Sequence, residues 1–392
     1  MVTACPDGRV TMIVSRVVLK NWRNFQKVDV QMTDRVFLVG PNASGKSNFL
    51  DVFRFLRDIA KPGGGLQKAV KDRGGVSKIR CLAARTDPVV EIEIFLSESP
   101  GVPPKWRYSI GIEQEVRGNR QPLLVHEKVW MNNRILLNRP DDSDGIDKLR
   151  LTQTHLEQIN SNKRFREISD FFESVQYLHI VPQLLRHPEA FPGPEIPGDP
   201  FGRKFLERLA KTPEKVRKSR LKKIETALQT AVPQLKNLSF IKDDAGVPHL
   251  EAVYEHWRPK AGKQREDQFS DGTLRLIGLL WSLLEGDSLL LLEEPELSLN
   301  AGIVSKLAPL IAKLQRQRGR QVMISTHSAD LLSDKGIGGE MILMLTPSQE
   351  GTQIRLSSSD AEIKMLLDSG LSVADVVLPR TAPQRALTAW AI

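Results

Sequence analysis

Cysteine is almost absent from this chain of 392 residues, which contains only Cys5 and Cys81. Two cysteines argue against a disulfide framework and suit a reducing cytosol, so we expect a cytoplasmic protein. The seven histidines form no close ligand pair with one another or with a cysteine. This spacing argues against a structural zinc site.

Long apolar runs are also missing. Apolar residues make up 40% of the chain, but they never form a run of about eighteen, the length that a membrane-spanning helix needs. We therefore expect no membrane-spanning segment and no membrane partner. Residues 1–10 lack an apolar core of signal-peptide length, and Met12 could serve as the start of the protein.

Acidic residues are fewer than basic ones, since 47 Asp and Glu against 56 Lys and Arg give a net charge of +9. Residues 203–223 are the most basic segment, with ten Lys or Arg and two Glu, and their sparse apolar stripe predicts a pair of basic helices. A DNA contact and a solvated surface explain this segment equally well. The candidate DNA-binding residues are Arg217, Lys218, Arg220, Lys222 and Lys223.

The most informative motif is the phosphate-binding loop pattern GPNASGKS at residues 40–47, which follows the apolar run 36–39 and precedes a predicted helix at 48–59. Its glycines allow successive backbone N–H groups to point at a phosphate, and the following helix adds its positive end. Lys46 would reach the β- and γ-phosphates, and the Ser47 hydroxyl would hold Mg²⁺. A glycine turn without a ligand is the alternative, but the flanking strand and helix argue against it. The expected nucleotide contacts are Gly40, Pro41, Asn42, Ala43, Ser44, Gly45, Lys46, Ser47 and Asn48.

Two further apolar runs end in polar residues. The run 288–292 precedes Glu293 and Glu294, which places two carboxylates at the edge where α/β sheets hold their ligands. Glu293 could hold Mg²⁺, and Glu294 could orient or deprotonate the attacking water. His327 follows the run 321–324 and could hydrogen-bond a terminal phosphate. A charged strand cap and a structural histidine are the alternatives.

Ser270 and Gly272 stand directly before a predicted helix at 274–285. Serine is a good N-cap and glycine lets the backbone approach a ligand closely, so this helix start could bind an anion. An ordinary capped helix is the alternative.

The remaining patterns indicate an α/β chain. Alternating runs predict an antiparallel sheet with one wet face, and helices alternate with strands from Ser270 onward, as in a parallel sheet with crossover helices. We expect an exposed loop at 61–80, a helix at 151–175, a buried strand at 177–181, a proline-rich break at 187–200 and a further helix at 361–367. Strands are expected at 17–19, 28–30, 36–39, 89–96, 106–116, 123–131, 134–137, 238–241 and 250–256.

These motifs, in this order, resemble those of the ABC-type ATPases, and more closely the SMC/RecF-like branch that includes the ATP-binding part of OLD-family proteins. The run LKNWRNF at 19–25 is similar to the N-terminal strand of that branch. The resemblance implies an α/β P-loop NTPase fold of the ABC-ATPase type, with a mixed central sheet, an antiparallel β subdomain and an inserted helical arm. The expected divisions are the N-terminal part of the head at 12–183, a basic helical arm at 184–264, the C-terminal part of the head at 265–346 and an extension at 347–392.

The resemblance also implies ATP and Mg²⁺ as cofactors and a head-to-tail homodimer, or a higher oligomer, that encloses two ATP molecules. Ser270 and Gly272 of one subunit would meet the γ-phosphate held by Lys46 of the other. Glu294 matches the catalytic glutamate and His327 the switch histidine.

Three further positions carry over from the family. Ser298 and Asn300 fall where the family's D-loop crosses the dimer interface, and Gln183 is the candidate for the glutamine that senses Mg²⁺. The chain departs from the family in two places. Its signature is SDGT rather than SGGQ, and Glu293 stands where many ABC proteins have aspartate.

An ATPase of this build is expected to act on DNA or on an operon-encoded effector protein, in phage defence or DNA maintenance. The segment after His327 is too short for the Toprim nuclease domain of OLD proteins, so we expect the effector to be a separate protein. The alternative is an ATP-gated scaffold with slow turnover that holds a toxin-like or nuclease-like partner. The SDGT signature and the long insert argue against a transporter subunit.

Overall fold

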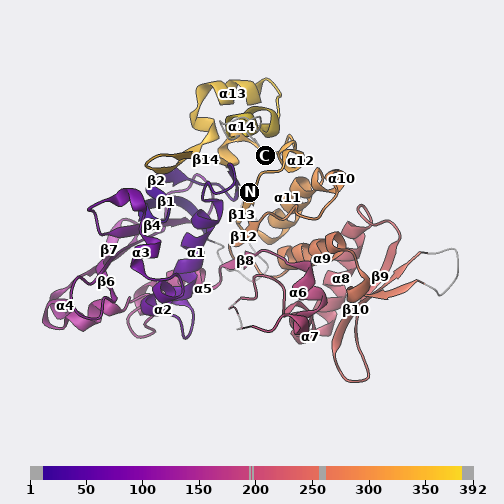
Figure 1. Ribbon diagram of the computed structural model, residues 1–392, viewed down its shortest axis with the longest axis horizontal. Helices are drawn as coiled ribbons and strands as arrows, with labels where there is room; N and C mark the ends of the chain where they lie inside the picture. Colours follow the sequence, from indigo (N-terminus) through magenta and orange to yellow (C-terminus); the bar gives the residue numbers. More distant parts are fainter. Residues whose placement is uncertain (1–11, 194–195, 197, 256–261, 382–392) are drawn as a thin grey trace, which may run out of the picture.

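The computed structural model describes residues 12–193, 196, 198–255 and 262–381. A central sheet lies between two lobes (Figure 1). One lobe holds an antiparallel sheet and the helices α1 to α5, and the other holds α6 to α9 with a small three-stranded sheet. The last helices, α13 and α14, lie beyond one end of the central sheet.

The central sheet has six strands in the order β15–β14–β3–β13–β12–β8. All neighbouring pairs are parallel except β14 with β15, so the expected mixed central sheet is confirmed. The strands are β3 (Arg35–Val39), β8 (Gln176–Leu178), β12 (Leu290–Glu293), β13 (Val322–Thr326), β14 (Ile342–Ser348) and β15 (Gly351–Leu356).

Both faces of this sheet are covered by a hydrophobic core. Because successive side chains of a strand point to opposite sides, each parallel strand contributes residues to both cores. On β3, Val36 and Leu38 belong to a first hydrophobic core, and Phe37 and Val39 belong to a second. On β13, Met323 faces the first core. This double burial explains why the parallel strands have continuous apolar sequences.

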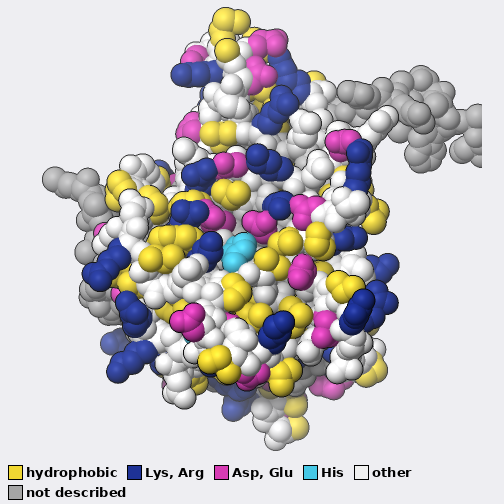
Figure 2. Space-filling view, turned by 90° about the vertical axis from the view of Figure 1, so that its left-hand side faces the viewer, with side chains coloured by type: hydrophobic (Ala, Val, Ile, Leu, Met, Phe, Trp, Pro, Cys, Tyr) yellow, Lys and Arg dark blue, Asp and Glu magenta, His cyan; other side chains and the backbone are white. Residues whose placement is uncertain are grey.

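The antiparallel sheet also has six strands, in the order β2–β1–β4–β5–β6–β7. It covers the first core, and the alternating runs that predicted it are confirmed. On its outer side, Lys, Arg, Asp and Glu side chains are intermixed with apolar ones (Figure 2). The strands are β1 (Ile13–Trp22), β2 (Phe25–Gln31), β4 (Val90–Ser97), β5 (Trp106–Gln114), β6 (Pro122–Met131) and β7 (Arg134–Arg139).

Residues 61–80 do not form the expected exposed loop. They contain α2 (Leu66–Lys71) and α3 (Val76–Ile79), which follow α1 (Lys46–Ala60). Gly65 and Gly75, with φ angles of 111° and 95°, stand directly before the two short helices. The prediction is wrong because these glycines start helices, and the apolar residues between them are buried.

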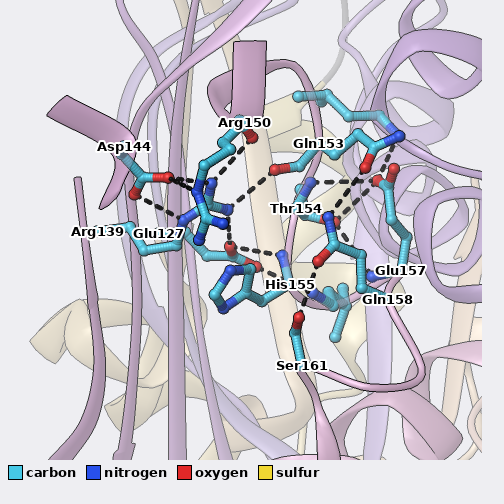
Figure 3. Close-up of polar contacts among 12 residues, drawn as sticks. Glu127, Arg139, Asp144, Arg150, Gln153, Thr154, His155, Glu157, Gln158 and Ser161 are labelled. Carbon is cyan, nitrogen blue, oxygen red and sulfur yellow. Dashed lines mark hydrogen bonds and ion pairs between the residues drawn. The ribbon is translucent and has the colours of Figure 1, made fainter. Parts of the chain in front are cut away.

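The helix expected at 151–175 is reduced to α5 (Arg166–Glu173). The backbone N–H groups of His155 and Leu156 donate to the buried carboxylate of Glu127, at 2.8 and 3.1 Å, and not to helical carbonyls. Glu127 also accepts from Arg139, whose guanidinium pairs with Asp144 at 2.8 Å. This Arg139 network holds the segment after α4 (Asp142–Ile146) against β6 and β7 (Figure 3).

The second lobe contains the predicted pair of basic helices and the two strands expected near 238–241 and 250–256. Its helices are α6 (Pro182–Arg186), α7 (Phe205–Lys211), α8 (Glu214–Leu228) and α9 (Asp271–Leu284), and its strands are β9 (Leu235–Lys242), β10 (Pro248–Tyr254) and β11 (Lys263–Arg265). Both α8 and α9 contribute to the second core. The expected strand at 177–181 ends at Leu178 because the N–H groups of His179 and Val181 bond to the carbonyls of Pro200 and Phe201. Position 256 of the strand expected at 250–256 lies outside the described residues.

The C-terminal part completes the central sheet. Strand β14 crosses the boundary expected between 346 and 347, and the division of the chain into domains stays a prediction. The remaining helices are α10 (Ala301–Val304), α11 (Leu307–Arg318), α12 (Ala329–Leu332), α13 (Ala361–Asp368) and α14 (Val373–Thr381). Within the described ranges, no helix combines the length and the apolar character needed to cross a membrane.

Candidate nucleotide-binding site

The phosphate loop joins β3 to α1, as its sequence predicts. Gly45 precedes α1 with φ of 95°, and a side chain there would collide with the Asn24 amide. A Cβ on Gly40 would lie 2.7 Å from the Leu345 carbonyl oxygen. Asn42 and Ala43 are exposed at the tip of the loop, whereas Ser44 is buried. Close packing therefore favours glycine at both positions, and the positive φ angle also favours it at position 45.

Lys46 lies back across the loop that precedes it. Its Nζ donates to the carbonyl oxygens of Gly40 and Pro41, at 2.9 and 3.1 Å. Burial lowers the pKa of Lys46, and the nearby carboxylates of Glu294 and Glu293 partly offset this effect. The ammonium group is therefore held at the loop but is poorly solvated, a state in which a phosphate would be a favourable partner.

Glu293 lies between two hydroxyl groups. The Ser47 hydroxyl donates to Oε1 of Glu293, and the Tyr177 hydroxyl donates to Oε2. The structure thus brings together two of the three predicted Mg²⁺ ligands. Tyr177 was not among the predicted site residues, because nothing near it in the sequence shows that β8 lies beside β12.

Glu294 and His327 also meet. Nδ1 of His327 is 3.2 Å from Oε1 of Glu294, and half of the His327 side chain is exposed. Glu294 has φ of 44°, and its N–H donates to the carbonyl oxygen of Ser325 at 3.0 Å. A left-handed backbone conformation is uncommon for glutamate, and residues in this conformation cluster at functional sites.

Glu296 is a buried carboxylate beside the site that was not among the predicted site residues. Its Oε1 accepts from the Thr326 hydroxyl at 2.5 Å, and burial raises the pKa of Glu296. Its Oε2 is buried and has no hydrogen-bond partner within the part of the chain that the structure describes. Glu296 therefore links the segment after β12 to the end of β13.

The phosphate loop is also anchored by a side chain from the turn between β1 and β2. Nδ2 of Asn24 donates to the Ser44 carbonyl at 2.9 Å and to the Thr352 hydroxyl at 2.7 Å. Its Oδ1 accepts from the Asn48 amide at 2.9 Å. Asn48, a predicted nucleotide contact, thus has its amide on Asn24. Asn24 was not among the predicted site residues, although it belongs to the run LKNWRNF.

Ser270 and Gly272 form the start of α9. The Ser270 hydroxyl accepts from the Thr273 N–H at 3.2 Å, so Ser270 is the N-cap that its sequence predicts. A Cβ on Gly272 would lie 2.9 Å from the carbonyl oxygen of Ser298. These residues and Asn300 line a hollow of about 630 Å³. None of residues 40–47 is among the described residues that line it.

Gln183 lies on α6, and its side chain contacts the first residue of α9. Its amide donates to Oδ2 of Asp271 at 2.9 Å, and Arg186 pairs with the other oxygen of Asp271 at 2.6 Å. These contacts place Gln183 beside the Ser270 turn. A role for Gln183 in holding Mg²⁺ stays a prediction.

Two of the candidate DNA-binding side chains contact the protein itself. The guanidinium of Arg217 stacks on Phe240, 4.0 Å from the ring centroid, and donates to the Leu209 carbonyl at 3.0 Å. Arg220 lies over the Trp281 ring at 5.1 Å. These contacts favour a structural role for both arginines in the packing of α8.

The three candidate lysines on α8 are exposed. Lys218 pairs with Glu214 at 2.6 Å across one helical turn, a contact that contributes little when both groups are solvated. The predicted DNA contact therefore depends on Lys218, Lys222 and Lys223, and it stays a prediction.

Comparison with known proteins supplies a family. Residues 35–334 match the family described as "AAA domain, putative AbiEii toxin, Type IV TA system". The endonuclease GajA of Bacillus cereus (strain VD045) is 43% identical over 47 residues, which are 12% of this chain and 8% of GajA. That match is too short to transfer the activity of GajA.

Two solved SMC heads show the same fold. The SMC head bound to the C-winged helix domain of ScpA superposes with a TM-score of 0.50 at 15% identity, over 87% of this chain and 96% of that one. A Pyrococcus furiosus SMC head with an extended coiled coil, bound to the C-terminal domain of ScpA, also gives 0.50, at 14% identity over 92% and 100% of the two chains. The expected fold class is thereby confirmed.

Proposed function

Because the chain belongs to this family of AbiEii-type AAA domains and has the fold of an SMC head, we propose that it binds ATP at residues 40–48 and hydrolyses it. The observation that carries the proposal is the pairing of β13 with both β3 and β12. It brings the phosphate loop, His327 and the two glutamates to the carboxyl edge of three neighbouring strands. This edge is where open α/β sheets bind their ligands.

Ser47 and Glu293 fit Mg²⁺, since a hydroxyl and a carboxylate oxygen already in contact are the oxygen ligands that this ion prefers. Mg²⁺ bound with ATP would neutralise charge on the β- and γ-phosphates. Lys46 would exchange its two carbonyl partners for phosphate oxygens. The backbone N–H groups of the loop would orient the nucleotide.

Glu294 is the proposed general base for the attacking water. Its carboxylate is about one quarter exposed and close to His327, so it can accept a proton without being sealed in the core. His327 would hold that carboxylate in place. The two residues come from neighbouring strands, so their separation is set by the sheet.

A second copy of the chain would complete the site. The hollow at Ser270, Gly272, Ser298 and Asn300 is built on the turn before α9, and the described lining excludes the phosphate loop of the same chain. A head-to-tail dimer would place this turn over the nucleotide of its partner. The N-cap at Ser270 supports anion binding there.

We propose that ATP-driven closure acts on an effector protein or on DNA, in the cytoplasm and in phage defence or DNA maintenance. The AbiEii description and the short GajA match support a defence role, and the exposed lysines of α8 support a DNA contact. An ATP-gated regulator with slow turnover, bound to a toxin-like or nuclease-like partner, is the alternative that the same family description favours.

The test measures ATP hydrolysis and oligomeric state together, for the wild type and Glu294→Gln, with and without duplex DNA. We expect Glu294→Gln to lower turnover by at least about 100-fold, the usual size of a general-base contribution, and to accumulate an ATP-dependent dimer. Glu98→Gln is the matched control, because Glu98 is an exposed glutamate after β4. It should behave as the wild type.

The results separate the alternatives. Stimulation of ATP hydrolysis by DNA would identify DNA as the ligand on which the closing dimer acts. Slow ATP turnover that rises only with a co-purified protein would favour the ATP-gated regulator. A wild-type protein that binds no ATP, measured directly by equilibrium titration, would contradict the proposed function.

A further inference from the structure

Tyr177 touches the candidate Mg²⁺ site from a strand that the motifs do not include. Strand β8 pairs with β12 in parallel, with Tyr177 opposite Leu291. Because residues i and i+2 of a strand share a face, Leu291 and Glu293 lie on the same side of the sheet. The Tyr177 side chain thus extends along β12 and its hydroxyl reaches Oε2 of Glu293.

The tyrosine ring is itself held in place. Tyr177 is 7% exposed and belongs to the first core. The guanidinium of Arg54, on α1, lies 4.1 Å from the ring centroid, a cation–π distance. The backbone of β8 is fixed by its pairing with β12. The hydroxyl is therefore presented to Glu293 by a ring with little freedom to move.

Glutamate at position 293 makes such a contact useful. A glutamate side chain has one more rotatable bond than an aspartate, so its carboxylate can adopt more positions and loses more entropy when it is fixed. While Oε2 of Glu293 accepts a hydrogen bond from the Tyr177 hydroxyl, Oε1 of Glu293 faces the Ser47 hydroxyl. The two hydroxyl groups thus define one orientation of the carboxylate.

We propose that Tyr177 is a positioning residue for Mg²⁺ binding, and that its hydroxyl holds the longer Glu293 side chain so that one carboxylate oxygen faces Ser47. This inference rests on the proposed nucleotide site. It concerns Mg²⁺ affinity in the presence of ATP, and it does not require that Tyr177 touch the nucleotide.

Tyr177→Phe removes the hydroxyl and keeps the ring that packs under Arg54. We expect the Mg²⁺ concentration that gives half-maximal enhancement of ATP binding to rise about tenfold to a hundredfold, the effect of one hydrogen bond to a charged group. ATP affinity measured in EDTA should stay as in the wild type. The measurement is a titration of the protein with a fluorescent ATP analogue at a series of MgCl₂ concentrations.

Tyr108→Phe is the matched control. The Tyr108 hydroxyl donates to the buried carboxylate of Glu127 at 3.2 Å, in the antiparallel sheet. The control removes the same kind of contact elsewhere, so it should leave the Mg²⁺ dependence unchanged. A loss of ATP affinity that is equal in EDTA and in Mg²⁺ for Tyr177→Phe would show a structural role and overturn the proposal.

A double-mutant cycle tests the mechanism. Aspartate at position 293 is too short to keep both hydroxyl partners, so Tyr177→Phe in the Glu293→Asp background should shift the Mg²⁺ requirement by less than about twofold. An equal shift in both backgrounds would contradict an action through Glu293. If the wild type fails to bind the analogue at any MgCl₂ concentration, the nucleotide site itself is rejected. This result differs from the one that rejects only the role of Tyr177, in which the wild type binds the analogue.

Discussion

Two clusters of charged side chains, the Arg139 network and the site around Glu293 and Glu294, use the same residue types in opposite ways. In the Arg139 network, Glu127 accepts hydrogen bonds from Arg139, from two backbone N–H groups and from Tyr108. Its carboxylate is fully buried. In the other cluster, Glu293 contacts two hydroxyl groups and Glu294 a half-exposed histidine.

The difference separates a structural network from a candidate binding site. A buried carboxylate whose donors include a cation and several N–H groups has its hydrogen-bonding capacity filled by the protein and has no need of a ligand. At the sheet edge, Glu293 has two hydroxyl partners, which a cation could replace. We therefore expect damage to the Arg139 network to reduce stability, and damage to the site or its anchors to reduce nucleotide affinity.

The largest expected effect is that of Arg139→Met. Removal of the shared cation leaves the buried carboxylate of Glu127 without its ion pair and leaves Asp144 with Arg150 as its remaining cation, so the free energy of unfolding should fall by about 3–5 kcal/mol. ATP affinity of the molecules that remain folded should be unchanged. Urea unfolding and ATP titration measure the two quantities.

Lys20→Met is the control for this substitution. Lys20 pairs with Asp87 and Glu91 at 3.0 Å, but its side chain is 44% exposed, so its removal should cost less than about 1 kcal/mol. If Arg139→Met lowered ATP affinity as strongly as it lowers stability, the separation of the two clusters would be wrong.

His155 makes the Arg139 network sensitive to acid. Burial, with a contribution from Arg139, lowers the pKa of His155 from 6.5 to about 4. At pH values between 6.5 and 4, His155 is protonated in the unfolded chain but neutral in the folded protein. The free energy of unfolding therefore falls as the pH drops from 6.5 to 4. The loss is on the order of 2–3 kcal/mol at the acid end. His155→Gln should remove this part of the pH dependence.

His249→Gln is the control with the opposite sign. A hydrogen bond with Glu266 is the main cause that raises the pKa of His249, so its contribution is complete below the unfolded pKa and is lost as the pH rises through the folded value. Unfolding measured between pH 4 and pH 8 distinguishes the two. Equal pH dependence in the wild type and His155→Gln would rule out the proposed role of His155.

The smallest effect is expected for Asn24→Ala. This substitution removes the side chain that bonds Ser44, Asn48 and Thr352, so the phosphate loop should lose its anchor to β15. ATP affinity should fall about tenfold, equivalent to about 1–2 kcal/mol. Asn138→Ala, at an exposed position of β7, should leave the affinity unchanged. An unchanged affinity for Asn24→Ala would show that the loop holds its shape alone.

Much of the fold could be predicted from local patterns. The period of two predicted β4 to β7, and the apolar runs before Gly40, Glu293 and Ser325 predicted three parallel strands. Failures occurred where distant side chains override local patterns. The helix expected at 151–175 is shortened by the carboxylate of Glu127, and the glycine-rich segment 61–80 folds because its apolar residues reach the first core.

By itself, the sequence determined the strand–loop–helix unit at 35–60, the carboxylates after β12 and the N-cap of α9, because these depend on residues adjacent in the chain. Only the tertiary structure decided that Tyr177 meets Glu293, 116 positions away, and that Asn24 meets Thr352, 328 positions away. It also decided that Arg217 and Arg220 pack against Phe240 and Trp281. The physical reason is that such contacts depend on which strands and helices become neighbours, and that order is set by the burial of two cores across the whole chain.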